Sequence, residues 1–124
     1  MKRDKISITE AELEIMNVLW ASGEPMTAQQ VSDTLHGKDW KYSTIATLFS
    51  RMVDKGTVTY EKRGRFFYYT PSINEKEYKT HETKNFISNL YNGSVKNLVA
   101  SLFESKQMSA EDIDEIKKLF ELEE

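Results

Sequence analysis

The sequence predicts a mainly α-helical fold with one small β-hairpin. We expect a winged helix-turn-helix domain over residues 1–71 and a C-terminal helical dimerisation domain over residues 72–124. Three helix signatures follow one another, the apolar period changes from 3.6 to 2 after Gly56, and three amphipathic segments complete the chain. Because three short helices enclose little core, a hairpin that closes the group gives the winged-helix arrangement.

Capping boxes mark the starts of the first two helices. The Thr9 hydroxyl can accept from the third helical N–H, and the Glu12 side chain can reach back to the cap. Thr27 and Gln30 repeat this pattern. We expect the first helix to end near residue 21 and the second at Gly37.

The third helix has the most regular pattern in the sequence. We expect it to span residues 43–55, with Ser43 as its N-cap and Gly56 just beyond its end. Its apolar residues recur at i, i+3, i+4, i+7 and i+8, which places them on one buried face. These residues are Ile45, Leu48, Phe49, Met52 and Val53.

The opposite face of this helix carries Thr44, Thr47 and Arg51, with Ser43 further round the helical wheel. A face that meets only water usually carries Glu, Lys or Gln, since these are better helix formers than Ser and Thr. Threonine methyls and hydroxyls can contact base edges, and arginine can bind guanine with two hydrogen bonds. We interpret this face as a DNA-reading surface; the alternative is a tolerant solvated face.

A β-hairpin follows the third helix. Residues 57–62 and 65–70 are rich in β-branched and aromatic residues, Arg63-Gly64 separates them, and Pro71 closes the unit. We expect alternate rings of the second strand to pack inward rather than to stack on bases.

The formal net charge of −3 conceals an uneven distribution. Residues 38–65 hold seven basic and three acidic residues, whereas the last 14 residues hold seven acidic and two basic. Lys62, Arg63 and Arg65 surround the hairpin turn, where they would lie along a phosphate backbone. This asymmetry indicates nucleic-acid contact by the first half of the chain, with ordinary solvated surface as the alternative.

Residues 72–124 predict three amphipathic helices, with Asn74 capping the first and Ser109 capping the last. Such a segment buries little by itself, so its apolar stripes need a partner. The partner is either the winged helix of the same chain or a second copy, and a second copy suits a palindromic operator. The expected dimer-interface residues are Phe86, Leu90, Val95, Leu98, Val99, Leu102, Phe103, Ile116, Leu119 and Phe120.

Several classes of function find no support in the sequence. Cysteine is absent, and His36 and His81 stand far apart, outside any metal-ligand spacing. There is no glycine-rich phosphate loop and no nucleophile–base pattern, so we expect no enzymatic activity, no metal and no cofactor. No apolar stretch is long enough to span a bilayer, so we expect no membrane insertion and a cytoplasmic location.

Three segments resemble the penicillinase-repressor (BlaI, MecI and CopY) family of bacterial transcriptional regulators. They are residues 8–16, residues 44–56, which are the most specific of the three, and residues 90–95. The resemblance implies a dimeric winged-helix repressor that blocks transcription from dyad operators. It implies base contacts from Ser43, Thr44, Thr47 and Arg51, and phosphate contacts from Lys41, Arg63 and Arg65.

The sequence departs from two branches of that family. The copper-responsive branch carries a cysteine-rich metal site, which a chain without cysteine cannot form. The β-lactam branch is inactivated by proteolysis in the dimerisation region, at an Asn-Phe bond. The aligned pair here is Ser101-Leu102, so two alternatives stay open: a cut at this variant sequence, or no cut. Because the copper-responsive branch is excluded, regulation of the β-lactam-resistance type, with a sensor protease as partner, is the expectation. A different inducing signal, or a protein-interaction adaptor built on a winged helix, remains the alternative.

Overall fold

The computed structural model describes residues 7–35 and 40–123, apart from the side chains of residues 122 and 123. His36 and Lys38 lie outside the described residues, as does Gly37, where the second helix was expected to end; that helix ends earlier, at Thr34. The chain divides into two compact units, Met1–Glu77 and Tyr78–Glu124. Each unit is described here by itself.

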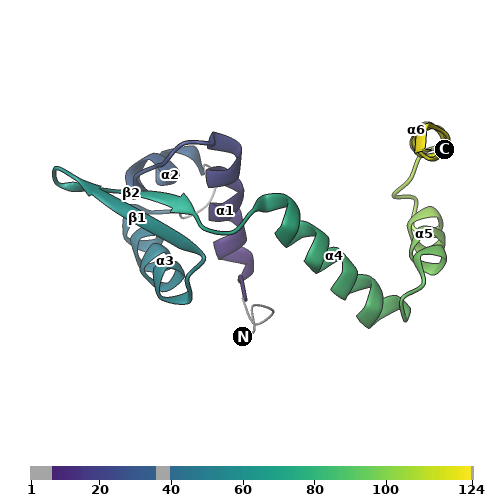
Figure 1. Ribbon diagram of the computed structural model, residues 1–124, viewed down its shortest axis with the longest axis horizontal. Coiled ribbons are helices and arrows are strands. Elements are labelled where there is room, and N and C mark those ends of the chain that lie inside the picture. Colours follow the sequence, from purple (N-terminus) through teal and green to yellow (C-terminus); the bar gives the residue numbers. More distant parts are fainter. Residues whose placement is uncertain (1–6, 36–39, 124) are drawn as a thin grey trace. The chain divides into compact units, whose positions relative to one another are not determined.

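The first unit contains three helices followed by a two-stranded antiparallel hairpin (Figure 1). The elements are α1 (Glu10–Ser22), α2 (Ala28–Thr34), α3 (Tyr42–Lys55), β1 (Val58–Arg63) and β2 (Phe66–Pro71). Both expected capping boxes are present, because Thr9 and Thr27 accept from the backbone N–H of Glu12 and Gln30, respectively. The mainly helical winged-helix fold is therefore confirmed.

The start of α3 differs from the expectation, because Ser43 is not its N-cap. The helix begins at Tyr42, and Lys41 occupies the cap position with extended backbone and no side-chain cap hydrogen bond. The Ser32 hydroxyl donates to the Trp40 carbonyl at 2.7 Å and so ties the segment before the helix to α2. Ser43 consequently lies within the first turn, where its side chain is exposed.

One apolar core holds the first unit together. The apolar face expected for α3 is buried, apart from Val53, which is half-buried. The fully buried apolar side chains are Ile15, Met16, Leu19, Val31, Ile45, Phe49, Met52 and Val58. Two polar side chains, Glu12 and Thr57, are also completely buried, which the sequence pattern did not predict.

The hairpin turn lies one residue further along than expected. Arg63 pairs with Phe66, so the loop is Gly64-Arg65 rather than Arg63-Gly64. Gly64 has φ +66° at the first loop position, where a two-residue hairpin of type II′ requires glycine. Arg63 therefore belongs to β1 and Arg65 to the loop.

The second unit contains the rest of α4 (Glu75–Tyr91), then α5 (Val95–Glu104) and α6 (Ala110–Glu123). The expected caps are present, since Asn74 accepts from the Glu77 N–H and Ser109 from the Asp112 N–H. No residue of α4 or α5 is buried. Within the described residues, no helix is long and apolar enough to cross a membrane.

The segment that follows Pro71 is hydrogen-bonded to the winged helix. Ser72 bonds to the Gly56 and Thr57 carbonyls, and the Ile73 carbonyl accepts from the Trp20 indole. These bonds fasten the segment after β2 to the winged helix.

Candidate nucleic-acid interface

The outer face of α3 presents the four side chains expected to contact bases. Ser43, Thr44, Thr47 and Arg51 are all exposed, and together with Leu48 they line one open depression. These hydroxyl and guanidinium groups are therefore available for contacts with a ligand, while the opposite face of α3 is buried in the core.

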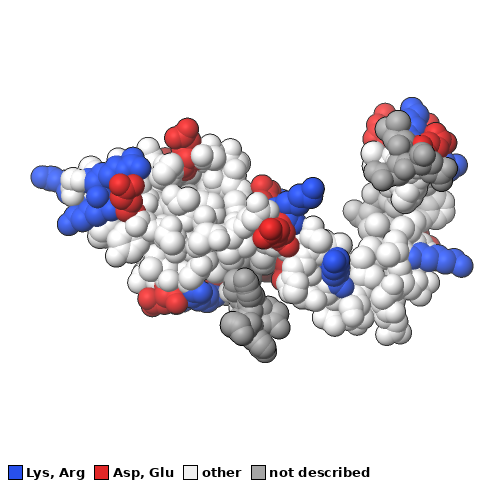
Figure 2. All heavy atoms as spheres, viewed as in Figure 1, with Lys and Arg blue, Asp and Glu red and all other residues white. Residues whose placement is uncertain are grey.

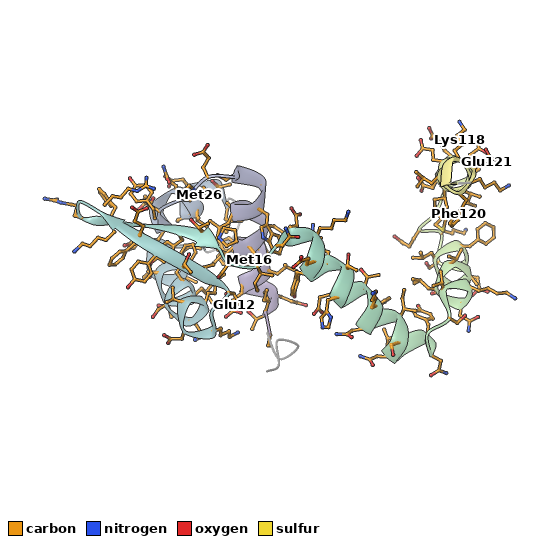
Figure 3. All side chains as sticks on the ribbon, viewed as in Figure 1. Glu12, Met16, Met26, Lys118, Phe120 and Glu121 are labelled. Atoms are coloured by element: carbon orange, nitrogen blue, oxygen red, sulfur yellow. The ribbon has the colours of Figure 1, made fainter. Side chains whose placement is uncertain are left out.

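An ion pair between the partly exposed Lys55 and the buried Glu12 fixes α3 against α1. Lys55 Nζ lies 2.8 Å from Glu12 Oε1 and also donates to the Ser7 carbonyl at 3.0 Å. Glu12, labelled on α1 in Figure 3, accepts from the Thr9 N–H with the same oxygen. Burial raises the pKa of Glu12, but these hydrogen bonds and the charges of Lys55 and Arg51 outweigh burial and leave its pKa below the ordinary value. The last turn of α3 is thus held by a charged carboxylate.

The hairpin is fixed to α3 by an aromatic stack. The rings of Phe49 and Tyr69 lie 3.8 Å apart with an interplanar angle of 3°. On the other side, Met26 and Tyr69 exchange two backbone hydrogen bonds, so β2 also pairs with the loop after α1. The wing therefore has a defined position beside α3.

The strand register determines which wing side chains share the face of Tyr69. Successive strand residues point to opposite faces, so Tyr60, Lys62 and Phe67 lie on the same face as Tyr69. Tyr69 packs inward, as expected, whereas Phe67 remains 44% exposed, with Lys62 Nζ 5.9 Å from its ring centroid. On this face, Tyr69 packs against the core beside α3, whereas Phe67, nearer the tip of the hairpin, is exposed.

Arg63 lies on the opposite face of the hairpin. Its guanidinium is 3.1 Å from Glu61 and stacks over Tyr68 at 4.7 Å from the ring centroid. Both partners of the ion pair are exposed, so the pair contributes little to stability. Arg65 is exposed in the loop, and Figure 2 shows Lys and Arg side chains gathered at this tip.

Two exposed residues near the interface were not among the contacts that the family resemblance implies. Lys62 lies on the same face of the wing as Tyr69, which the alternation of strand side chains indicates for either placement of the turn. Tyr42, 54% exposed in the first turn of α3, gave no such signal because the helix was expected to begin after it. Lys41, an expected phosphate contact, is exposed at the same helix end.

The described residues contain no cluster of three or more His, Asp or Glu side chains that could hold a metal ion. An exposed helix with hydroxyl and guanidinium groups, set beside a hairpin with a basic tip, defines a winged-helix DNA-binding protein. The comparison with known proteins gives the family. Residues 8–122 match the penicillinase repressor family, and the chain belongs to this family.

Similar proteins cover most of the chain. It is 33% identical to the penicillinase repressor of Bacillus licheniformis, over 92% of this chain and 89% of that protein. It is 29% identical to the methicillin resistance regulatory protein MecI of Staphylococcus aureus (strain N315), over 96% of this chain and 97% of that protein. The family is one of transcriptional repressors rather than enzymes, as the sequence led us to expect.

Solved structures resemble the DNA-binding part. The DNA-binding domain of the repressor BlaI matches with a TM-score of 0.52 and 37% identity, covering 63% of this chain and 94% of that chain. The monomeric form of Bacillus licheniformis BlaI, in complex with the blaP half-operator, matches with a TM-score of 0.50 and 38% identity. That match covers 60% of this chain and 92% of that chain.

Proposed function

We propose that this protein is a homodimeric transcriptional repressor that binds a dyad DNA operator. One observation carries the proposal: Ser43, Thr44, Thr47 and Arg51 are exposed together in one depression on α3. In this arrangement Arg51 binds a guanine with two hydrogen bonds, while the threonines contact base edges through methyl and hydroxyl groups. The similarity to BlaI, solved with a half-operator, supports the same mode of binding.

Phosphate contacts position this reading surface. Lys41 stands at the N-terminus of α3, where backbone N–H groups without helical partners also favour an anion. Arg65 occupies the tip of the wing. Arg63 makes its phosphate contact by exchanging its exposed pair with Glu61 for one with DNA, which costs little.

A second copy of the chain covers the apolar stripes of α4, α5 and α6. Eight of the ten expected interface residues are exposed large hydrophobic side chains; the other two, Leu98 and Leu102, are half-buried. Phe120, labelled on α6 in Figure 3, is 69% exposed. A surface of this kind costs free energy in water, and association of two identical faces removes it.

Regulation by proteolysis of the β-lactam-resistance type requires α5 to open. Ser101 and Leu102 lie within this helix and are half-buried, and the Ser101 hydroxyl accepts a hydrogen bond from the Tyr91 hydroxyl at 3.1 Å. A helical, hydrogen-bonded segment resists cleavage until it unfolds locally. A sensor protease would therefore cut the open form and separate the dimerisation helices from the DNA-binding unit.

Selection of bound sequences from random duplex DNA tests the proposal. We expect enrichment of an inverted repeat whose half-sites lie about one helical turn, or a multiple of it, apart. Recovery of no preferred sequence, with binding that disappears at modest salt, would contradict a sequence-reading repressor and favour a protein-interaction adaptor.

A further inference from the structure

The segment that joins the hairpin to α4 is fastened to the winged helix at three points. The Ser72 N–H donates to the Thr57 carbonyl at 3.0 Å, and the Ser72 hydroxyl donates to the Gly56 carbonyl at 2.9 Å. The Trp20 indole Nε1–H donates to the Ile73 carbonyl at 3.0 Å. The Ile73 side chain is half-buried and packs against the core. We call residues 72–73 the strap.

The helix α4 begins directly after the strap. Asn74 Oδ1 accepts from the Glu77 N–H at 2.9 Å, and residues up to Glu77 belong to the first unit. Only Asn74 stands between the carbonyl held by Trp20 and the first residue of α4. The Trp20 bond therefore holds the chain two residues before the first residue of α4.

A small tilt at the start of α4 produces a large displacement of its far end. The helix has 17 residues, so it spans about 25 Å at about 1.5 Å per residue. A tilt of about 10° at its first turn moves the other end by about 4 Å. This displacement exceeds the rise of about 3.4 Å between successive base pairs.

We propose that Trp20 is a positioning residue that fixes the start of α4 and thereby sets the half-site spacing accepted by the dimer. The inference rests on the proposed function, because spacing has meaning only for a dimer on a dyad. Trp20 itself lies in α1, which carries none of the expected DNA contacts. Its role is transmitted through the Ile73 carbonyl, the group that orients the start of the dimerisation helices.

The variant Trp20→Phe tests this role, because it keeps an aromatic ring in place and removes the Nε1–H donor. The full chain is titrated with a single half-site and with dyads whose half-site separation changes in steps of one base pair. We expect half-site affinity within about twofold of the parent. The preference for the best separation over its neighbours should fall by about tenfold, to near equality.

The matched control is Ile73→Val, which trims the packing of the strap and leaves its carbonyl bond to Trp20 intact. This control should keep the parent's spacing preference. If Trp20→Phe does not fold, Ser72→Ala removes the neighbouring strap bond and should relax the same preference. An unchanged spacing preference, or an equal loss of half-site and dyad affinity, would overturn the inference. A parent chain that binds no specific half-site would instead overturn the proposed function.

Discussion

The Lys55 ammonium lies 2.8 Å from the Glu12 carboxylate and joins the last turn of α3 to the first turn of α1. The two residues are 43 positions apart, and the Glu12 side chain is completely buried. Glu12 Oε2 has no hydrogen-bond partner among the described residues, so Lys55 is central to keeping this carboxylate in the core. The helix proposed to read DNA, α3, is thus anchored at its C-terminal end by one charged pair.

Replacing Lys55 with methionine should destabilise the first unit by about 2 to 3 kcal/mol, because a buried carboxylate loses its charged partner. Urea unfolding of the full chain measures this change. The control Asp54→Asn alters an exposed charge in the same turn and should shift stability by less than about 0.5 kcal/mol. Equal stability of Lys55→Met and the parent would show that the pair does not hold α3.

The same carboxylate predicts how stability depends on pH. The pKa of Glu12 in the folded chain lies below its ordinary value of 4.5. The ionised form therefore stabilises the fold fully above that value, and this contribution is lost as the pH falls through the folded-state pKa. Urea midpoints measured between about pH 3 and pH 7 should fall less steeply for Glu12→Gln than for the parent. The control Glu10→Gln, an exposed position in the same turn, should retain the parent's steep decline; matching slopes for all three proteins would refute the assignment.

The local features of this fold were predictable, and the long-range ones were not. Both capping boxes depend on residues three positions apart, so Thr9 and Thr27 could be identified from the sequence. The burial of Glu12 depends on Lys55, far along the chain, and a glutamate in a first turn otherwise indicates only a cap.

In the candidate site, too, the local features were predictable from the sequence and the long-range ones were not. A helical wheel sufficed for the exposed face of α3, since one residue step always means about 100°. The wing was harder, because the position of the turn decides which of its basic residues belong to a strand and which belong to the loop. Placing the turn at Gly64-Arg65 instead of Arg63-Gly64 puts Arg63 in β1, on the face opposite Tyr69, and moves Arg65 from the strand into the loop. The pairing of Tyr69 with Met26, which fixes that strand, has no local signal.

The proposed dimer predicts that Phe120→Ser weakens association without unfolding the first unit. A two-fold interface contains each substitution twice, and loss of one buried phenylalanine costs about 1.5 to 3 kcal/mol. Dimer affinity should therefore fall by at least about 100-fold in analytical ultracentrifugation. The control Glu115→Ser changes an exposed polar position on α6 and should leave the affinity nearly unchanged. A parent chain that stays monomeric at all concentrations would rule out the dimer.

Cleavage within α5 should depend on the N-cap of that helix. Ser94 accepts from the Asn97 N–H at 3.0 Å, and Ser94→Ala should lower the free energy of opening by about 1 kcal/mol. A dilute protease of broad specificity should then cut within residues 95–104 about fivefold faster, as followed by mass spectrometry. Ser88→Ala, at an exposed position of α4, provides the control. If cutting in α5 proceeds at the same rate in both variants, helix opening does not limit access to Ser101-Leu102.

The central claim is that the exposed face of α3 reads bases while the wing tip contacts phosphates. The direct test is to titrate Arg51→Ala and Arg65→Ala with the selected operator, and with versions altered at single base pairs, over a range of salt concentrations. Arg51→Ala should cost about 1 to 3 kcal/mol and relax specificity at one base pair. Arg65→Ala should weaken binding to all sequences alike and reduce the salt slope by about 1. Operator affinity, base preference and salt slope that match the parent in both variants would contradict this account.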